Sequence, residues 1–181
     1  MRSLFAVIFG ILCAFSWCHE CKAGTHGIQS CQQVTSSHIG QGDAYGGAFR
    51  QNDYRLSLRI PSNLQGWGNT GDSPFHGFVI FLDPKEQSCL FLEMHIWAEE
   101  NDPQARPIVA RSVYLSHAKG WEINRSGRLH GRAYFNIATY FTNTHDGETD
   151  AGSLIFVTPG SDRDKTLPLF RQFRQSIRFG N

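Results

Sequence analysis

Glu93 and His95 are the residues whose types and spacing come closest to a chemical site. They stand two apart in Leu90–Ala98, a segment in which apolar residues alternate with aromatic and polar ones. Because successive side chains of a strand point to opposite faces, residues two apart share a face. A carboxylate and an imidazole on one face can bind zinc, or act together as an acid and a base.

A zinc site requires a third protein ligand, and His76 or His130 is the candidate. Either histidine reaches the pair only if the fold brings it there. The sequence favours the alternative, in which Glu93 and His95 form an outward pair on a partly covered face. The metal site formed by His76, Glu93 and His95 is kept as a second hypothesis.

Aromatic residues mark another candidate surface. His76 follows the turn-rich loop 66–74 and comes just before an apolar run. Amphipathic rings are common at interaction surfaces. We therefore predict a binding patch made of Trp67, Phe75, His76, Trp97 and Trp121. The alternative is that the rings cover the core and that His76 satisfies backbone groups of its loop.

Three acids alternate in a glycine-bounded loop, at Asp146, Glu148 and Asp150. The pattern is similar to a calcium loop, but Ala151 and Val157 stand where such a loop needs glycine and a bidentate acid. A solvated acidic loop is therefore the favoured interpretation. The chain also lacks Gly-x-Ser-x-Gly, P-loop, His-Glu-x-x-His and Gly-x-Gly-x-x-Gly motifs. We predict no catalytic residue and no cofactor.

The N-terminus has the pattern of a signal peptide. Arg2 supplies a positive charge and the apolar run Leu4–Trp17 follows it. The run is short of the ~20 residues of a membrane span. Cleavage after Ala23 would remove residues 1–23 and leave a periplasmic or secreted protein with no stable membrane span. The alternative is an uncleaved N-terminal anchor.

Cleavage leaves Cys31 and Cys89 as one pair in an oxidising compartment. A bond between them would close a long loop, and the chain-entropy estimate for such a loop is about 4 kcal/mol. The alternative is two free buried thiols. We predict the disulfide.

Length and charge limit the remaining possibilities. The chain has 181 residues and a net charge of +1. It has no basic stripe, so we do not expect nucleic acid as a partner. Residues 24–52 are rich in Gly, Ser, Gln and His, and we expect a polar, partly disordered leader there. Residues 53–181 are of a size for a single domain.

The periodicity of the chain predicts strands and two helices. Strands are expected at Tyr54–Ile60, at Gly77–Leu82 paired as a hairpin with the central strand Leu90–Ala98, and at 121–124, 132–142 and 153–158. A first helix is expected after Pro107, with Ile108, Val109, Ser112, Val113 and Leu115 on one side. A last helix is expected at 167–177, and 143–152 is expected to be a polar loop. This order favours an α+β domain, with a mainly antiparallel sheet of about five to seven strands and two helices packed on it.

Three short motifs resemble the Mog1/PsbP-like superfamily of small α/β/α domains, which includes many exported bacterial proteins. They are an opening strand with its proline, a glycine-rich entry into a long strand, and a closing helix with a Ser-hydrophobic-Arg-Phe tail, at 54–61, 127–133 and 170–179. Together they span nearly all of the mature chain. The resemblance implies a fold more than an activity, because that group has no shared catalytic residues to transfer.

The sequence therefore favours an exported, non-catalytic domain that binds a protein partner in the cell envelope. An immunity-type protein and an envelope accessory protein are two forms of this role. The expected contact surface is the loop from Gly66 to His76. The alternatives are a metal-assisted hydrolase using His76, Glu93 and His95, and a domain that binds a small ligand between sheet and helices.

Overall fold

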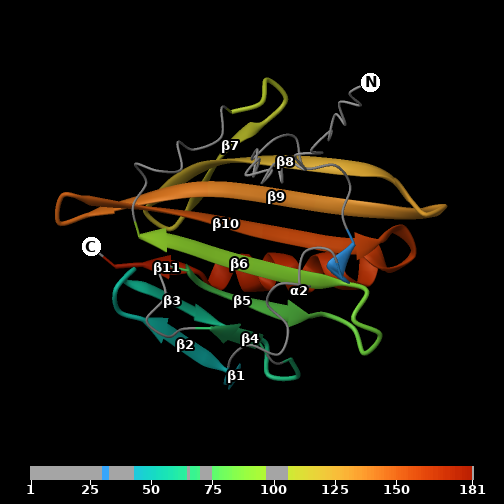
Figure 1. Ribbon diagram of the computed structural model, residues 1–181, viewed down its shortest axis with the longest axis horizontal. Helices are drawn as coiled ribbons and strands as arrows, with labels where there is room; N and C mark the ends of the chain where they lie inside the picture. Colours follow the sequence, from blue (N-terminus) through green and yellow to red (C-terminus); the bar gives the residue numbers. More distant parts are fainter. Residues whose placement is uncertain (1–29, 33–42, 65, 70–74, 97–105, 181) are drawn as a thin grey trace, which may run out of the picture.

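The computed structural model describes residues 30–32, 43–64, 66–69, 75–96 and 106–180. In these ranges the chain is α+β, with antiparallel sheets and one long helix (Figure 1). Its elements are β1 (Asp43–Tyr45), β2 (Ala48–Gln51), β3 (Leu56–Arg59), β4 (Gly66–Asn69), β5 (Phe75–Phe81), β6 (Cys89–Ile96), β7 (Arg111–Leu115), β8 (Ala118–Leu129), β9 (Arg132–His145), β10 (Glu148–Pro159), η1 (Gly160–Asp162), α2 (Arg163–Ser176) and β11 (Arg178–Phe179).

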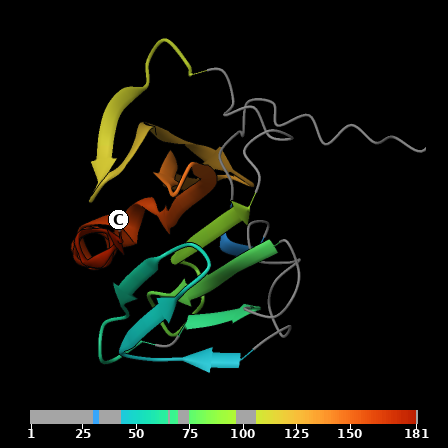
Figure 2. The same ribbon diagram turned by 90° about the vertical axis from the view of Figure 1, so that its left-hand side faces the viewer.

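The large sheet has eight strands in the order β1-β4-β5-β6-β10-β9-β8-β7, and a small sheet has the order β11-β3-β2. β6 lies inside the large sheet and forms a hairpin with β5, as the sequence predicts. Seen end-on, the large sheet bends around α2, with the small sheet beside the helix (Figure 2). The sheet therefore has one face covered by α2 and one face turned away from it.

Two-residue turns connect the strands of the two long hairpins. The β8–β9 turn is His130–Gly131 and the β9–β10 turn is Asp146–Gly147, and all four residues have positive φ. Two-residue hairpin turns of this kind require left-handed backbone, for which glycine is the least strained residue. The hairpins bring β8, β9 and β10 side by side over most of their length (Figure 1).

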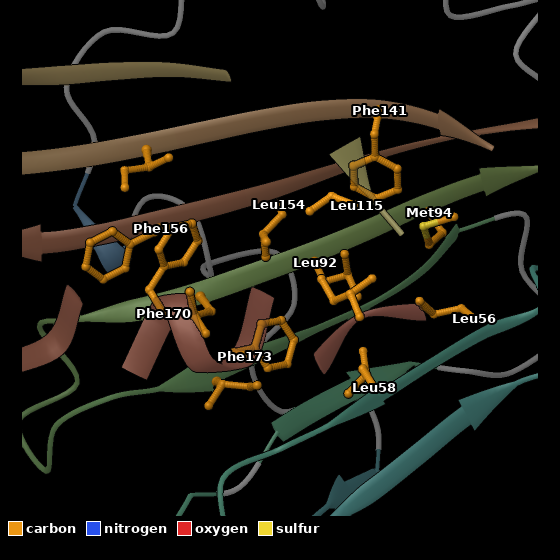
Figure 3. Close-up of a cluster of buried hydrophobic side chains, with 14 of the residues drawn as sticks. Leu56, Leu58, Leu92, Met94, Leu115, Phe141, Leu154, Phe156, Phe170 and Phe173 are labelled. Carbon is orange, nitrogen blue, oxygen red and sulfur yellow. The ribbon is translucent and has the colours of Figure 1, made fainter. Parts of the chain in front are cut away.

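The core lies between the sheet and α2. Phe156 on β10 stacks on Phe170 of α2 with ring centroids 4.9 Å apart, and Phe173 is fully buried beside Leu92 (Figure 3). The predicted alternation in Tyr54–Ile60 is confirmed, because Tyr54, Leu56, Leu58 and Ile60 are all buried. Complete burial of one such apolar side chain contributes about 1.5 to 3 kcal/mol.

The helix predicted after Pro107 is wrong. Residues 107–110 form a turn and Arg111–Leu115 form β7, so α2 is the one long helix of the described ranges. Val113 and Leu115 are buried as predicted, but buried residues two positions apart follow the period of a strand and not that of a helix. The same apolar residues fit both periods over so short a segment, and the neighbouring β8 supplies the hydrogen bonds that select the strand.

Other boundaries also differ from the prediction. Gly66–Asn69 is strand β4 where a loop was expected, and residues 143–152 continue the β9–β10 hairpin. The large sheet has one strand more than the upper expectation of seven. β1 and β2 lie within the segment assigned to a leader, and α2 begins at Arg163, before the predicted start at 167.

Candidate functional site

The segment before β7 forms a tight turn with apolar residues at its tip. The Ala110 amide donates to the Pro107 carbonyl over 2.9 Å, which makes Ile108 and Val109 the central residues. The Arg106 guanidinium donates to the Ala110 carbonyl over 2.8 Å and braces the turn. Central turn positions usually hold Gly, Pro, Asn, Asp or Ser, so an Ile-Val pair is unusual for a turn in water.

The large hydrophobic side chains that are exposed in the described ranges lie on one short segment, from this turn into β7. Ile108 is 104% exposed, Val109 78% and Tyr114, in β7 itself, 68%. The segment from the turn into β7 projects beyond β8 at the top of Figure 1. Scattered exposed apolar residues are ordinary, but a group of them on one short segment indicates an interaction site. We call these three residues and the outer side of β7 the β7 edge surface.

The backbone of β7 also has unused hydrogen-bonding capacity. In the part of the chain that the structure describes, β8 is the one neighbour of β7 in the sheet. The two-residue turn between Leu115 and Ala118 is closed by a hydrogen bond between these two residues, and bonded and non-bonded pairs alternate from there. The backbone N–H and C=O groups of Ser112 and Tyr114 therefore point away from β8. They are placed to accept another strand.

The exposed charges next to this edge are positive, at Arg106 in the turn before β7 and at Lys119 in the part of β8 that pairs with it. Residues 106–129 contain one acid, Glu122, which is buried. The cations of the same stretch are Arg106, Arg111, Lys119, Arg125 and Arg128. An acidic segment is therefore the favourable partner for this edge, and a second copy of the same edge is an unfavourable one.

Buried Glu122 fixes β7 to the rest of the molecule. Its carboxylate lies on the helix-covered face and forms ion pairs with Arg111 of β7 and with Arg174 of α2, the latter over 3.0 Å. The Thr139 hydroxyl of β9 donates to the same carboxylate over 3.0 Å. The network ties the edge strand, two central strands and the helix together, so the outer side of β7 is presented on a rigid support.

The strand register gives the positions of the predicted metal ligands. Glu93 and His95 occupy alternate positions of β6, and Glu93 lies opposite Gly77 and Ser153. The Ser153 hydroxyl donates to the Glu93 carboxylate over 3.3 Å. His76 lies opposite Met94, whose position belongs to the face of α2. Among the described residues, no group of three or more His, Cys, Asp or Glu side chains is arranged to hold a metal ion.

Trp121, one of the predicted binding residues, is packed against its neighbours. It is 8% exposed and lies with its ring centroid 4.3 Å from that of Tyr140 on β9. Burial raises the pKa of the Tyr140 phenol, Arg125 lowers it and Glu93 raises it. The strand register forms one row of opposite positions across β6, β10, β9 and β8, occupied by Glu93, Ser153, Tyr140 and Trp121. The row joins two residues that the sequence singled out separately.

The remaining predicted binding residues are placed only by their strands. Trp67 lies in β4, opposite Val79, and Phe75 begins β5, opposite His95. Trp97 lies outside the described residues. A binding role for these residues stays a prediction.

The predicted disulfide between Cys31 and Cys89 is present. Both cysteines are buried, in a cluster with Val79, Phe91 and Val157. The bond holds residues 30–32 against the start of β6, on the face turned away from α2. No helix in the described ranges has the length and apolar character needed to cross a membrane.

The predicted solvated acidic loop is wrong at Asp150. This residue is 3% exposed, and its carboxylate lies 2.8 Å from Nε2 of His145. Burial raises the pKa of Asp150, the hydrogen bond and charge of His145 lower it, and Glu148 raises it. Asn143 lies opposite in β9, and its buried side-chain nitrogen has no hydrogen-bond partner among the described residues. The pair closes the inner face of the β9–β10 hairpin.

No protein-family model matches the sequence, and no curated protein matches it. Solved structures do match. A protein from Bacteroides thetaiotaomicron is 12% identical over 75% of this chain, with a TM-score of 0.48. This chain spans about half, 49%, of the length of that protein.

Two further solved structures are similar over nearly their whole length. LpqN of Mycobacterium tuberculosis, described as involved in cell envelope biogenesis, is 8% identical, with coverage of 84% of this chain and 98% of its own and a TM-score of 0.44. The PsbP of Synechocystis is 11% identical, with coverages of 78% and 95% and a TM-score of 0.38. The weak resemblance to PsbP-like proteins is confirmed. It is a similarity of fold and carries no argument about function.

Proposed function

We propose that this chain is an exported, non-catalytic domain that binds a protein partner in the cell envelope by accepting a strand at the β7 edge surface. The observation that carries the proposal is the coincidence of outward-facing backbone groups on β7 with the exposed side chains of Ile108, Val109 and Tyr114. Strand addition uses such an edge for affinity and nearby side chains for specificity.

Export is supported by two features of the chain. The N-terminal pattern of Arg2 followed by Leu4–Trp17 is that of a signal peptide. The Cys31–Cys89 disulfide is of the kind that persists in oxidising compartments such as the periplasm. An immunity-type protein and an envelope accessory protein both remain within this proposal.

The chemistry of the edge selects the kind of partner. The partner segment is extended, carries apolar residues that cover Ile108 and Val109, and is acidic at its flanks. Its acids face the exposed cations, such as Arg106 and Lys119. A second copy of the chain would instead bring like charges together at the same edge.

Site-specific photo-crosslinking tests the proposal in the native exported fraction. A photoreactive phenylalanine analogue replaces Tyr114 in one variant and Lys165, an exposed residue of α2, in a matched control. We expect one dominant adduct from position 114 and none at that mass from position 165. Mass spectrometry of the adduct should locate the linkage in an extended, acidic-flanked segment of another protein. The same adducts from both positions, or a homodimer alone, would overturn the proposal.

A further inference from the structure

A groove of about 580 Å³ lies far from β7, between three segments that are distant in the sequence. Its walls are residues 30–32, the β5–β6 turn with Lys85 and Glu86, and the β8–β9 hairpin with His130. These segments meet at the right-hand end of the molecule in Figure 1. The volume falls in the range of about 300 to 1,000 Å³ that is usual for small-molecule sites.

The floor of the groove is apolar and aromatic. Phe81 at the end of β5 and Tyr134 on β9 line it, and both are partly buried against the cluster around the disulfide. Leu129 lines the wall beside the β8–β9 hairpin. A ligand with an aromatic or aliphatic body would therefore remove apolar surface from water on binding.

The rim of the groove carries an excess of positive charge from two separate elements. Lys85 comes from the β5–β6 turn and Arg132 from the start of β9, with His130 beside it, while Glu86 is the one acid among the lining residues that the structure describes. The backbone under Lys85 is fixed, because the Asp83 carboxylate accepts hydrogen bonds from the backbone amides of residues 85, 87 and 88. Cations held on separate supports can converge on one anionic group.

The disulfide builds one wall of the groove. Cys31 and its two neighbours line the groove, and the bond to Cys89 is what attaches them to β6. The Sγ of Cys31 also lies 3.2 Å from the carbonyl oxygen of Gln87, so residues 30–32 contact the β5–β6 turn directly at this side of the groove. Reduction would release this wall, so the shape of the groove depends on the redox state of the compartment.

We propose that this groove is a binding site for a small amphiphilic anion, a molecule with an apolar body and a single carboxylate, sulfonate or phosphate group. The body lies on Phe81 and Tyr134, and the anionic group lies between Lys85 and Arg132. The site forms in the oxidised protein. It is independent of the β7 edge surface, because the two use opposite ends of β8.

Fluorescence titration of the oxidised full chain with 8-anilinonaphthalene-1-sulfonate, an aromatic sulfonate, tests the proposal. We expect saturable binding of one probe per chain. Arg132→Gln and Lys85→Gln should each raise the Kd about five- to tenfold. Lys165→Gln, which removes an exposed cation of α2, should leave the Kd unchanged. An equal effect of all three variants, or binding that does not saturate, would overturn the proposal.

Competition and reduction sharpen the result. Laurate or benzoate should displace the probe, whereas inorganic phosphate at the same concentration should not. Displacement by phosphate alone would contradict an apolar subsite. A Cys31→Ala/Cys89→Ala variant should lose at least tenfold in affinity, and unchanged affinity in that variant would contradict the disulfide wall. Far-UV circular dichroism shows whether that variant is folded. If it is unfolded, the Kd of Arg132→Gln decides whether the site exists, because that variant keeps the disulfide.

Discussion

Two arginine side chains converge on the buried carboxylate of Glu122. Arg111 is 62% exposed and Arg174 is 22% exposed at the side chain, whereas the carboxylate side chain is fully buried. Removing one member of a buried ion pair costs about 3 to 5 kcal/mol, because the remaining charge is left uncompensated. Contact of both arginines with water reduces that figure here.

Glu122→Gln should therefore lower the free energy of unfolding by about 2 to 3 kcal/mol. Urea unfolding followed by tryptophan fluorescence measures the change. Glu148→Gln, at an exposed position of β10, is the matched control and should change stability by less than about 0.5 kcal/mol. Equal effects of the two substitutions would show that the network does not hold β7.

Asp150 gives the folded protein a pH dependence of definite sign. Its pKa is raised by burial from the ordinary value of 3.8, so the folded chain takes up this proton before the unfolded chain does as the pH falls. The contribution of this group to stability is thus present in full below the unfolded pKa. It is lost as the pH rises through the folded pKa.

Asp150→Asn should remove the contribution of this carboxyl to the pH dependence of the unfolding free energy. As the pH is raised from below 3.8 toward neutrality, the unfolding free energy of the wild type should fall relative to that of the variant. Urea midpoints at a series of pH values measure the difference. Asp53→Asn, at an exposed turn position, is the control and should run parallel to the wild type. A wild-type curve that rises relative to Asp150→Asn would contradict the assigned sign.

For single residues, the spacing in the sequence predicted that Glu93 and His95 take positions on one face of a strand. It could not predict the burial of Asp150. Polar residues at buried positions break the hydrophobic alternation, so residues 143–152 resembled a loop. The Asp146–Gly147 dipeptide was the available signal, because it is among the strongest hairpin turns. With it, Asn143 and Asp150 become opposite positions of two paired strands.

At the scale of elements, β7 is the edge strand on which the proposed function depends. Natural edges are often protected by charge, proline or short length, because exposed backbone groups invite pairing. β7 is short and carries one arginine, Arg111, but keeps the outward backbone groups of Ser112 and Tyr114. An edge that carries apolar residues at its entry turn is therefore poised for a specific partner strand.

Ser112→Pro should block strand addition and leave the fold intact. Proline removes an N–H that points away from β8, and edge strands tolerate it at such positions. Affinity for the captured partner, measured by surface-immobilised binding, should fall at least tenfold. Ser112→Ala keeps the N–H and should bind within about twofold of the wild type. Comparable loss in both variants would implicate the side chain and contradict strand addition.

Sequence reasoning missed this edge because it placed Ile108 and Val109 on the buried stripe of a helix. Hydrophobic periodicity assumes that apolar residues are buried, and here the two residues are exposed. The period cannot distinguish a functional apolar turn from a core position. The last helix was predicted well because Phe170, Phe173 and Ile177 do meet the core.

At the scale of the whole molecule, one disulfide connects the N-terminal segment to the centre of the large sheet. The two cysteines are 58 positions apart in the sequence. A loop of this length corresponds to a chain-entropy stabilisation of about 4 kcal/mol. Cysteine count and the N-terminal pattern were enough to predict the bond, because the predicted cleavage after Ala23 leaves two cysteines and therefore one pairing.

The Cys31→Ala/Cys89→Ala variant should unfold at a lower urea concentration than the oxidised wild type, by about 2 to 4 kcal/mol in free energy. The wild type in reducing buffer should approach the variant, while the variant should be insensitive to reductant. Equal stability of oxidised wild type and variant would mean that the bond does not constrain the chain.

Amide hydrogen exchange of the chain, with and without its captured partner, is the decisive experiment for strand addition at β7. We expect the amides of Ser112 and Tyr114 to exchange slowly only in the complex, and the inward amides of β7 to be protected in both states. Protection confined to another edge or face, with exchange at Ser112 and Tyr114 unchanged, would contradict it.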